Sequence, residues 1–435
     1  MLFTKTIKNL LRMIDNIFIL GKKLDEQDSL VSFADLFHRP TSKIGKQLVY
    51  FCGNSLGLQP KSVRQYVEQE LLDWQNLGVE GHFHGKNPWF AYHHFLTEST
   101  ARLVGALPLE VVVMNSLTVN LHLLMISFYR PTSQRYKIVI EGGAFPSDIY
   151  AVQSQAKLHG FDPEEAIVAL VPRAGEHTLR TADIIAALEA ESNQIALVML
   201  GGVNYYTGQL YDLEAIATKA HEIGAMVGYD LAHAAGNVVL RLHEWQVDFA
   251  VWCSYKYLNS GPGGTSGAFV HERHANEPDL PRLAGWWGHD EQSRFLMEAK
   301  FVPQLGAAGW QLSNAQILPM AAHQASLAIF DRATMPALRQ KSEKMTDFLF
   351  KSLDQINPNN QYFTIITPRN PAERGCQVSM LMNNNGRAIF DYLTEHDIVA
   401  DWRNPNVIRI APVPLYNSFS EIAQFVNILQ QALCS

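Results

Sequence analysis

Apolar and polar positions follow two different patterns along the chain. From about residue 110, short apolar runs typical of buried strands alternate with stretches whose apolar residues have helical spacing. The predicted strands lie in VVVMN, YKIVIEGG, QIALVMLGGV, AMVGYD and DFAVWCSYKY, and two predicted helices lie in TVNLHLLMISF and DLEAIATKAHEIG. This alternation predicts a parallel sheet with helices on both faces. Active sites of such sheets lie beyond the carboxyl ends of the strands.

The pattern changes after about residue 310. One long helical stretch is followed by three short strands, in QYFTIITP, CQVSMLMN and NVIRIAP, and by a closing helix in EIAQFVNILQQAL. Ser418 and Glu421 have the spacing of a capping box for that last helix. We therefore expect an N-terminal segment over 1–60, a large α/β domain over 61–310 and a small α+β domain over 311–435.

The N-terminal segment has helical spacing of apolar residues, at Leu10, Leu11, Ile14, Ile17 and Phe18. Its longest apolar run is too short for a secretory signal core or a membrane span. We expect an amphipathic arm that packs on the small domain or on a partner subunit. An organelle-targeting helix is the less favoured alternative, because the segment contains an aspartate and has no Ser/Arg bias.

Composition and charge exclude several classes of protein. With 435 residues and a formal net charge of −7, the chain has the size of a large enzyme and no basic patch for nucleic acid. The four cysteines lie far apart, without the spacing of a zinc site or the density of a disulfide scaffold. We therefore expect a cytosolic protein that binds a small molecule, with neither nucleic acid nor a membrane as its partner.

The candidate chemistry begins with Asp230 and Lys256. Asp230 ends an apolar strand in VGYDLAHA, and Lys256 follows the next strand in CSYKYLNSGPGG. A carboxylate that holds a ring nitrogen and a lysine that forms a Schiff base are the two groups that pyridoxal phosphate requires. Taken singly, they are a turn aspartate and a surface lysine; their order and spacing favour the cofactor site.

Two further loops could complete such a site. Asn115 to Thr118 separate a strand from a helix, where backbone N–H groups bind phosphate, although Thr118 could equally be a plain helix cap. The glycines of NSGPGGTSG follow the lysine, so they are no Walker loop and instead predict a tight turn beneath the cofactor. Phe145 in EGGAFPSD could stack on a flat ring, but alone this loop is more simply a turn.

At this point the chain resembles a known family, the kynureninases, which are pyridoxal-phosphate enzymes of the fold type I aminotransferase superfamily. The resemblance extends from about residue 50 to the C-terminus, through GNSLG, NSLTVNLHLL, AFPSD, YTGQ, YDLAHAAGNV, CSYKYLNSGPGG, GWWGH, QLSNAQIL and RNPNVIRIAPVPLYNS. It implies a large domain with a mainly parallel seven-stranded sheet and a smaller α+β C-terminal domain. It also implies a homodimer whose active sites are shared across the interface.

The resemblance assigns roles to individual residues. It implies that Lys256 forms the Schiff base and later removes the substrate α-proton, that Tyr255 reaches the phosphate, and that Asp230 holds the pyridine nitrogen. The other implied cofactor contacts are Leu117, Thr118, Phe145, Pro146, Ser147, Asp148 and His233, with Trp286 and Asn314 given by the neighbouring subunit. The implied substrate contacts are Ser55, His82, Ser313, Asn314 and Arg409, the last of which clamps the α-carboxylate. Gly201 departs from the animal pattern, in which a serine contacts the cofactor.

The implied reaction is a step of tryptophan catabolism: hydrolysis of L-kynurenine or 3-hydroxy-L-kynurenine to anthranilate or 3-hydroxyanthranilate plus L-alanine. His82, Ser313 and Asn314 resemble the set that favours the 3-hydroxy substrate, although His82 could equally be a loop histidine without a ligand. A cysteine desulfurase is a weaker alternative, because Tyr255 stands where that family has a histidine and Cys376 begins an apolar strand. An aminotransferase or a non-catalytic relative are further alternatives.

Overall fold

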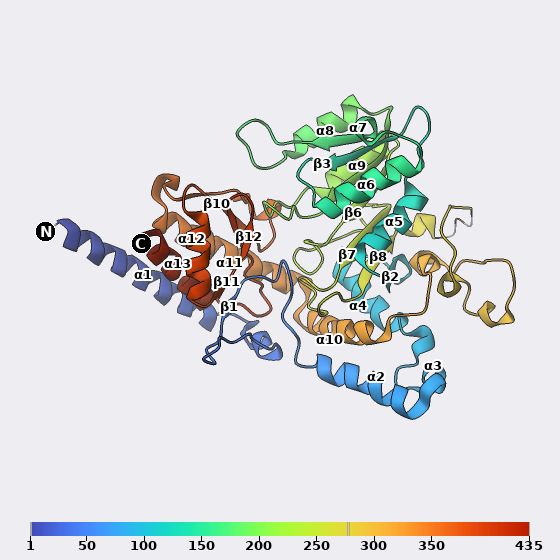
Figure 1. Ribbon diagram of the computed structural model, residues 1–435, viewed down its shortest axis with the longest axis horizontal. Coiled ribbons are helices and arrows are strands. Elements are labelled where there is room, and N and C mark those ends of the chain that lie inside the picture. The colour runs from blue at the N-terminus through green and yellow to red at the C-terminus, as the bar shows by residue number, and fades with distance from the viewer. Residues whose placement is uncertain (1, 276, 278, 435) are drawn as a thin grey trace. The chain divides into compact units, whose positions relative to one another are not determined.

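The structure, a computed structural model, describes residues 2–275, 277 and 279–434 (Figure 1). It divides into two compact units. The large unit comprises Ser62–Tyr205 and Leu210–Arg332, and the small unit comprises Met1–Lys61, Tyr206–Gln209 and Ala333–Ser435. Each unit has its own sheet and core.

The large unit is built on a seven-stranded sheet with the order β2-β8-β7-β6-β5-β3-β4. All neighbouring strands are parallel except β8, which runs antiparallel to both β2 and β7. The strands are β2 (Val111–Met114), β3 (Lys137–Glu141), β4 (Ile167–Leu170), β5 (Ile195–Gly201), β6 (Met226–Asp230), β7 (Phe249–Cys253) and β8 (Ser266–Val270). The mainly parallel seven-stranded sheet is confirmed.

The strands form where the sequence has continuous apolar runs, because both faces of the sheet are covered. Every residue of β2, β7 and β8 is buried. On one face, Phe128 of a helix stacks on Phe249 of β7, with ring centroids 5.0 Å apart. The longer helices of this unit are α2 (Val63–Leu77), α4 (His94–Val104), α5 (Leu117–Phe128), α6 (Pro146–Leu158), α8 (Thr181–Ala190), α9 (Leu213–Glu222) and α10 (Ile317–Ala333). Short helices in the same unit are α3 (Gly81–His84) and α7 (Pro163–Ala166).

The small unit contains a four-stranded antiparallel sheet with the order β12-β13-β10-β9 and a separate parallel pair, β1-β11. Its strands are β1 (Val49–Tyr50), β9 (Phe363–Ile365), β10 (Val378–Met382), β11 (Ile398–Val399), β12 (Asp401–Arg403) and β13 (Val407–Ile410). Its helices are α1 (Leu2–Glu26), α11 (Met335–Ile356), α12 (Gly386–Glu395) and α13 (Phe419–Cys434). The α+β character of this unit is therefore as expected.

Helix α13 begins with the predicted capping box. The Glu421 backbone N–H donates to Ser418 Oγ at 3.1 Å, and the Ser418 N–H donates to Glu421 Oε2 at 3.1 Å. Asp25, near the end of α1, accepts the N–H groups of Phe419 and Ser420 at 2.7 and 2.9 Å. Helix α1 is thereby fixed to the first turn of α13.

Helix α1 also buries part of the predicted apolar stripe. Ile14 and Ile17 are buried in the core of the small unit. The side chains of Leu10 and Leu11 lie outside the described residues. Among the helices that the structure describes, none is long and apolar enough to cross a lipid bilayer.

The structure differs from the sequence reading at the long helical stretch after residue 310. That stretch is two helices, α10 and α11, separated at Thr334, whose φ of 62° is incompatible with a continuous helix. Helix α10 lies in the large unit, where Ser326 Oγ donates to the Leu258 carbonyl at 2.5 Å and Arg102 pairs with Asp331 at 3.0 Å. The structural division thus comes after Arg332, one helix later than the expected boundary.

Candidate functional site

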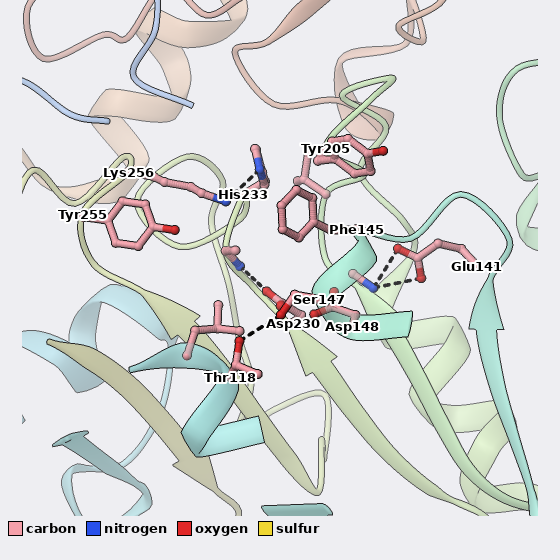
Figure 2. Close-up of a pocket in the computed structure, with 14 residues that line it drawn as sticks. Thr118, Glu141, Phe145, Ser147, Asp148, Tyr205, Asp230, His233, Tyr255 and Lys256 are labelled. Carbon is pink, nitrogen blue, oxygen red and sulfur yellow. Dashed lines mark hydrogen bonds between the residues drawn. The ribbon is translucent and has the colours of Figure 1, made fainter. Parts of the chain in front are cut away.

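The large unit has a pocket at the carboxyl edge of its sheet (Figure 2). The loops that follow β2, β3, β5, β6 and β7 surround it, as expected for a parallel sheet. It encloses about 550 Å³, counting the part open to solvent. Its lining residues are Leu117, Thr118, Glu141, Phe145, Ser147, Asp148, Gly201, Val203, Tyr205, Asp230, Ala232, His233, Tyr255 and Lys256.

Lys256 and His233 meet at one side of the pocket. Lys256 Nζ lies 3.0 Å from His233 Nε2 and 5.9 Å from the centroid of the Phe145 ring. His233 is buried, whereas Lys256 is half-buried. The amine is therefore held by a ring nitrogen while it faces the cavity.

Two aspartates line the pocket opposite Lys256 and His233. Asp230 is the last residue of β6, and Asp148 lies in the first turn of α6. Asp230 Oδ1 accepts the Ala232 N–H at 2.7 Å. Burial raises the pKa of Asp148 well above its usual range, and the charge and hydrogen bond of Asp230 raise it further. Burial likewise raises the pKa of Asp230, although the Ala232 N–H and Lys256 oppose this. Asp148 therefore keeps its proton and Asp230 is the better anion of the pair.

Hydroxyl groups gather at the N-terminus of α5. The helix begins at Leu117, so Ser116 is the cap and Thr118 lies in the first turn. Thr118 Oγ1 and Ser147 Oγ are 3.0 Å apart and both line the pocket. The first-turn N–H groups of a helix have no partner within the helix, so this end is suited to an anion.

Two aromatic side chains border the same space. Burial raises the pKa of Tyr255, and Cys253 contributes through its charge and a hydrogen bond, so the Tyr255 hydroxyl keeps its proton. Phe145 is 44% exposed, which leaves its ring available to a ligand, and it contacts Tyr205 edge-on at 5.3 Å.

The predicted turn after the lysine is present, with φ of +95° at Gly261 and +61° at Gly263, but neither glycine lines the pocket.

This set of residues fits pyridoxal phosphate. An amine, a buried acid pair and a helix N-terminus with hydroxyls correspond to its aldehyde, ring nitrogen and phosphate. Asp148 Oδ1 is buried and accepts no hydrogen bond from the described residues, so a polar group of a bound ligand could donate a hydrogen bond to it.

Two predicted substrate residues lie together in the small unit. Arg409 is 1% exposed, and its Nε and Nη2 contact Asp401 Oδ1 at 3.0 and 2.8 Å. Ser55 Oγ donates to Asp401 Oδ2 at 3.2 Å. A single carboxylate therefore orients both side chains.

The other predicted residues lie in the large unit outside the pocket lining. Ser313 and Asn314 are exposed, and Trp286 is 40% exposed. His82 Nδ1 contacts the Val79 carbonyl at 3.0 Å, and Pro146 is exposed at the start of α6. The structure does not bring this group together with Lys256 within one chain's pocket.

Four residues that line the pocket were not predicted from the sequence: Glu141, Val203, Tyr205 and Ala232. Glu141 stands in YKIVIEGG, where a carboxylate directly after an apolar strand was the available signal. Tyr205 stands in VNYYTGQ, between two other polar residues, and has no such signal. Cys376 is fully buried, as expected of a core residue.

Comparisons with known proteins agree with this geometry. Residues 338–429 match the family model of the kynureninase C-terminal domain. A kynureninase of Myxococcus xanthus is 54% identical over 94% of this chain and 96% of the relative, and one of Koribacter versatilis is 56% identical over 93% and 95%.

Solved structures show the fold. A cysteine desulfurase of Thermococcus onnurineus superposes with a TM-score of 0.71 at 18% identity, covering 88% of this chain and 94% of the other. The Escherichia coli desulfurase CsdA gives 0.73 at 17% identity, covering 93% and 98%. At such identities the likeness concerns the fold alone, which is fold type I, whereas the sequence relatives show that the chain belongs to the kynureninase family.

Proposed function

We propose that this protein hydrolyses L-kynurenine, 3-hydroxy-L-kynurenine or both to the corresponding anthranilate and L-alanine, with pyridoxal phosphate in the pocket of the large unit. The observation that carries the proposal is the placement of the Lys256 amine and the Asp148–Asp230 acid pair in one pocket, in a chain of this family. When bound, the cofactor takes up the electron pair released at the substrate α-carbon.

Lys256 has two roles in this proposal. Its amine would hold the cofactor covalently, and once freed by the substrate, Nζ would serve as the base that takes the proton from the substrate α-carbon. His233 Nε2, 3.0 Å from Nζ, orients the amine in the resting protein. Asp230 would hold the ring nitrogen in its protonated form, and Asp148, which keeps its proton, would donate a hydrogen bond to Asp230.

The other end of the pocket binds the phosphate. Leu117 and Thr118 contribute the first turn of α5, and Ser147 and the Tyr255 hydroxyl add donors. Phe145 covers the face of the ring. Water would add to the substrate γ-carbonyl, so that the γ-carbon leaves as the carboxylate of the anthranilate when its bond to the β-carbon breaks. Tyr255 is also the proposed donor of the proton that the β-carbon then receives.

Arg409 is the proposed receptor of the substrate α-carboxylate. A guanidinium binds a carboxylate through two parallel N–H groups, and Asp401 already fixes its plane. Ser55 shares that carboxylate and is proposed as a further substrate contact. Loss of Arg409 should therefore weaken substrate binding more than it slows the chemical step.

A homodimer with shared active sites is also proposed. Trp286 and Phe295 are 40% and 56% exposed and contact each other edge-on at 5.9 Å, and Phe295 stacks on Phe90 at 5.5 Å. Exposed aromatic clusters of this kind are typical of interfaces. Trp286 and Asn314 would then reach the cofactor of the partner subunit.

Mixed dimers test the sharing of sites. Lys256→Ala and Asn314→Ala should each be inactive alone, because each lacks one component of every site. Co-expressed, they form a mixed dimer in which one site is intact, so activity should return. A mixture as inactive as its parents would contradict shared sites.

The substrate preference is a separate proposal. His82, Ser313 and Asn314 are proposed to favour 3-hydroxykynurenine. A cytosolic location is proposed as well, because the described residues contain no disulfide. Purified protein supplied with pyridoxal phosphate should release alanine and a fluorescent anthranilate from both substrates. A higher kcat/KM for unsubstituted kynurenine would refute the preference, and no product from either would refute the function.

A further inference from the structure

Glu141 is a pocket carboxyl group to which the proposed reaction gives no role. It is the last residue of β3, it is 4% exposed, and it lies beside the end of β5 (Figure 2). Both of its side-chain oxygens accept the Gly201 N–H, at 3.2 Å for Oε1 and 3.1 Å for Oε2. Burying a charged carboxyl group this deeply is costly unless it is paired with an opposite charge and hydrogen-bonded.

Gly201 makes room for this carboxyl group. A Cβ atom at residue 201 would lie 2.8 Å from Glu141 Oε1, closer than van der Waals contact allows. The side-chain-free residue at the end of β5 and the glutamate at the end of β3 are therefore matched.

Glu141 belongs electrostatically to the acid pair of the pocket. The charge of Asp230 acts on Glu141, and the charge of Glu141 acts on Asp148. Lys256 is the cation that acts on Asp148 and Asp230, and the phenol of Tyr211 also faces Glu141. Three carboxyl groups around one lysine cannot all ionise without strong mutual repulsion.

Burial raises the pKa of Glu141 from 4.5 to about 7, against the opposing effect of the Gly201 N–H and with a further rise from Asp230. Glu141 therefore changes charge near neutral pH, whereas Asp148 holds its proton more firmly. A cationic pyridine ring beside Asp230 would favour the charged form of Glu141 by simple attraction.

We propose that Glu141 is a positioning residue of the site, which acts through the Asp148–Asp230 pair and releases a proton when the cationic cofactor ring binds beside that pair. This inference rests on the proposed function. Glu141, held in place beside Gly201, would become negatively charged when the positively charged ring binds.

The test is the number of protons exchanged when pyridoxal phosphate binds to apoprotein, measured by titration calorimetry in buffers of different ionisation enthalpy. Because the pKa of Glu141 is raised to about 7, we expect part of the apoprotein to carry this proton near pH 7, so Glu141→Gln should change the proton count there by up to about 0.5. The difference should vanish at pH 9, where Glu141 is already ionised. Equal counts for the two proteins at pH 7 would refute the proposal.

Glu110→Gln is the matched control. Glu110 is also a fully buried carboxylate of the large unit and accepts backbone N–H groups, from Leu107 and Glu272 at 2.8 Å each, but it does not line the pocket. It should leave the proton count of binding unchanged at both pH values. A change as large as that of Glu141→Gln would mean that the effect is a general consequence of losing a buried charge, which also refutes the proposal.

Gly201→Ala provides an independent variant should the glutamine protein fold poorly. Its methyl group should displace the Glu141 carboxyl group and alter the proton count in the same sense. Adding Gly201→Ala to Glu141→Ala should have little further effect, since the clashing atoms are gone; additive effects would contradict the pairing. Turnover of kynurenine by the wild type is measured alongside, so that a failed function and a failed role of Glu141 give different results.

Discussion

The edge of the large sheet opposite the pocket is held by one buried carboxylate, Asp248. It is 1% exposed and lies just before β7. Its Oδ2 accepts the Val227 N–H at 2.7 Å and contacts His221 Nε2 at 3.0 Å, while its Oδ1 contacts His274 Nε2 at 2.8 Å and pairs with Arg273. The carboxylate thus connects the starts of β6 and β7 to the segment after β8.

Asp248→Asn keeps the shape of this side chain and removes its charge. The amide group would face donors, so at least one buried N–H and the Arg273 guanidinium lose their acceptor. Breaking one side of a buried ion pair costs about 3–5 kcal/mol. At about 2–4 °C per kcal/mol for domains of this size class, the melting temperature of the apoprotein should fall by roughly 6–20 °C.

The loss should depend on pH in a defined direction. Burial alone would raise the pKa of Asp248, but hydrogen bonds from His221 and His274 and the charge of Arg273 outweigh it and lower the pKa below 3.8. The stabilisation by a group with a lowered pKa is present above its unfolded value and is lost as the pH falls through the folded value. The difference in melting temperature between wild type and variant should therefore be largest near pH 7 and decrease as the pH falls below 3.8.

Differential scanning calorimetry at pH 7 and in acid measures both effects. Asp183→Asn is the control, because that carboxylate forms a close pair at 2.6 Å with the exposed Arg173 and is itself only half-buried, with its side chain 33% exposed. Water and salt screen such a pair, so its removal should leave the melting temperature nearly unchanged. Equal melting temperatures for wild type and Asp248→Asn would refute the reasoning.

Three further predictions concern the site. Lys256→Ala should abolish the visible absorbance of the protein supplied with pyridoxal phosphate and lower kcat on the order of 10³-fold, the usual cost of losing a proton-transfer group; retained colour after dialysis with normal turnover would contradict this. Arg409→Gln should raise KM roughly 10- to 100-fold with a smaller effect on kcat, since a charged hydrogen bond is worth about 1.5–3 kcal/mol; steady-state kinetics with an unchanged KM would oppose it. The pKa of Glu141 is raised, so its contribution to stability is lost as the pH rises from 4.5 through about 7. Over that interval the free energy of unfolding of Glu141→Gln should increase by about 3 kcal/mol relative to that of the wild type, as measured by denaturant titrations. Parallel pH profiles for the two proteins would rule this out.

The sequence predicted those parts of the fold that depend on local pattern. The buried parallel strands and the capping box of α13 were found because apolar runs and the Ser418–Glu421 spacing are local signals. Strands β4 and β8 were not among the strands predicted from the apolar runs, and nothing in the composition of a short buried strand indicates that β8 runs antiparallel to its neighbours. The break at Thr334 was also missed, since the apolar spacing continues on both sides of it.

The candidate site was predictable where one residue type at one position carries the chemistry. Asp230 ends β6 and Lys256 lies three residues after the end of the neighbouring strand β7, so their order along the chain predicted their proximity. Glu141 could not be interpreted from its own segment, because its role depends on Gly201, sixty residues later, on the neighbouring strand. Arg409 and Ser55 were proposed from resemblance, and only the structure connects both to Asp401.

The register of the sheet explains why stability and chemistry are linked in the large unit. Gly201 pairs with Asp230, and Asp230 pairs with Val251, so the ends of β5, β6 and β7 are fixed relative to one another. A slip of one residue would turn Asp230 to the opposite face of the sheet and remove the room that Gly201 gives to Glu141. Asp248 fixes the same strands at their other end, through the Val227 N–H. The apolar core and Asp248 together allow these strands only one register. This fixed register is what holds the carboxyl groups of the pocket close together in a buried position.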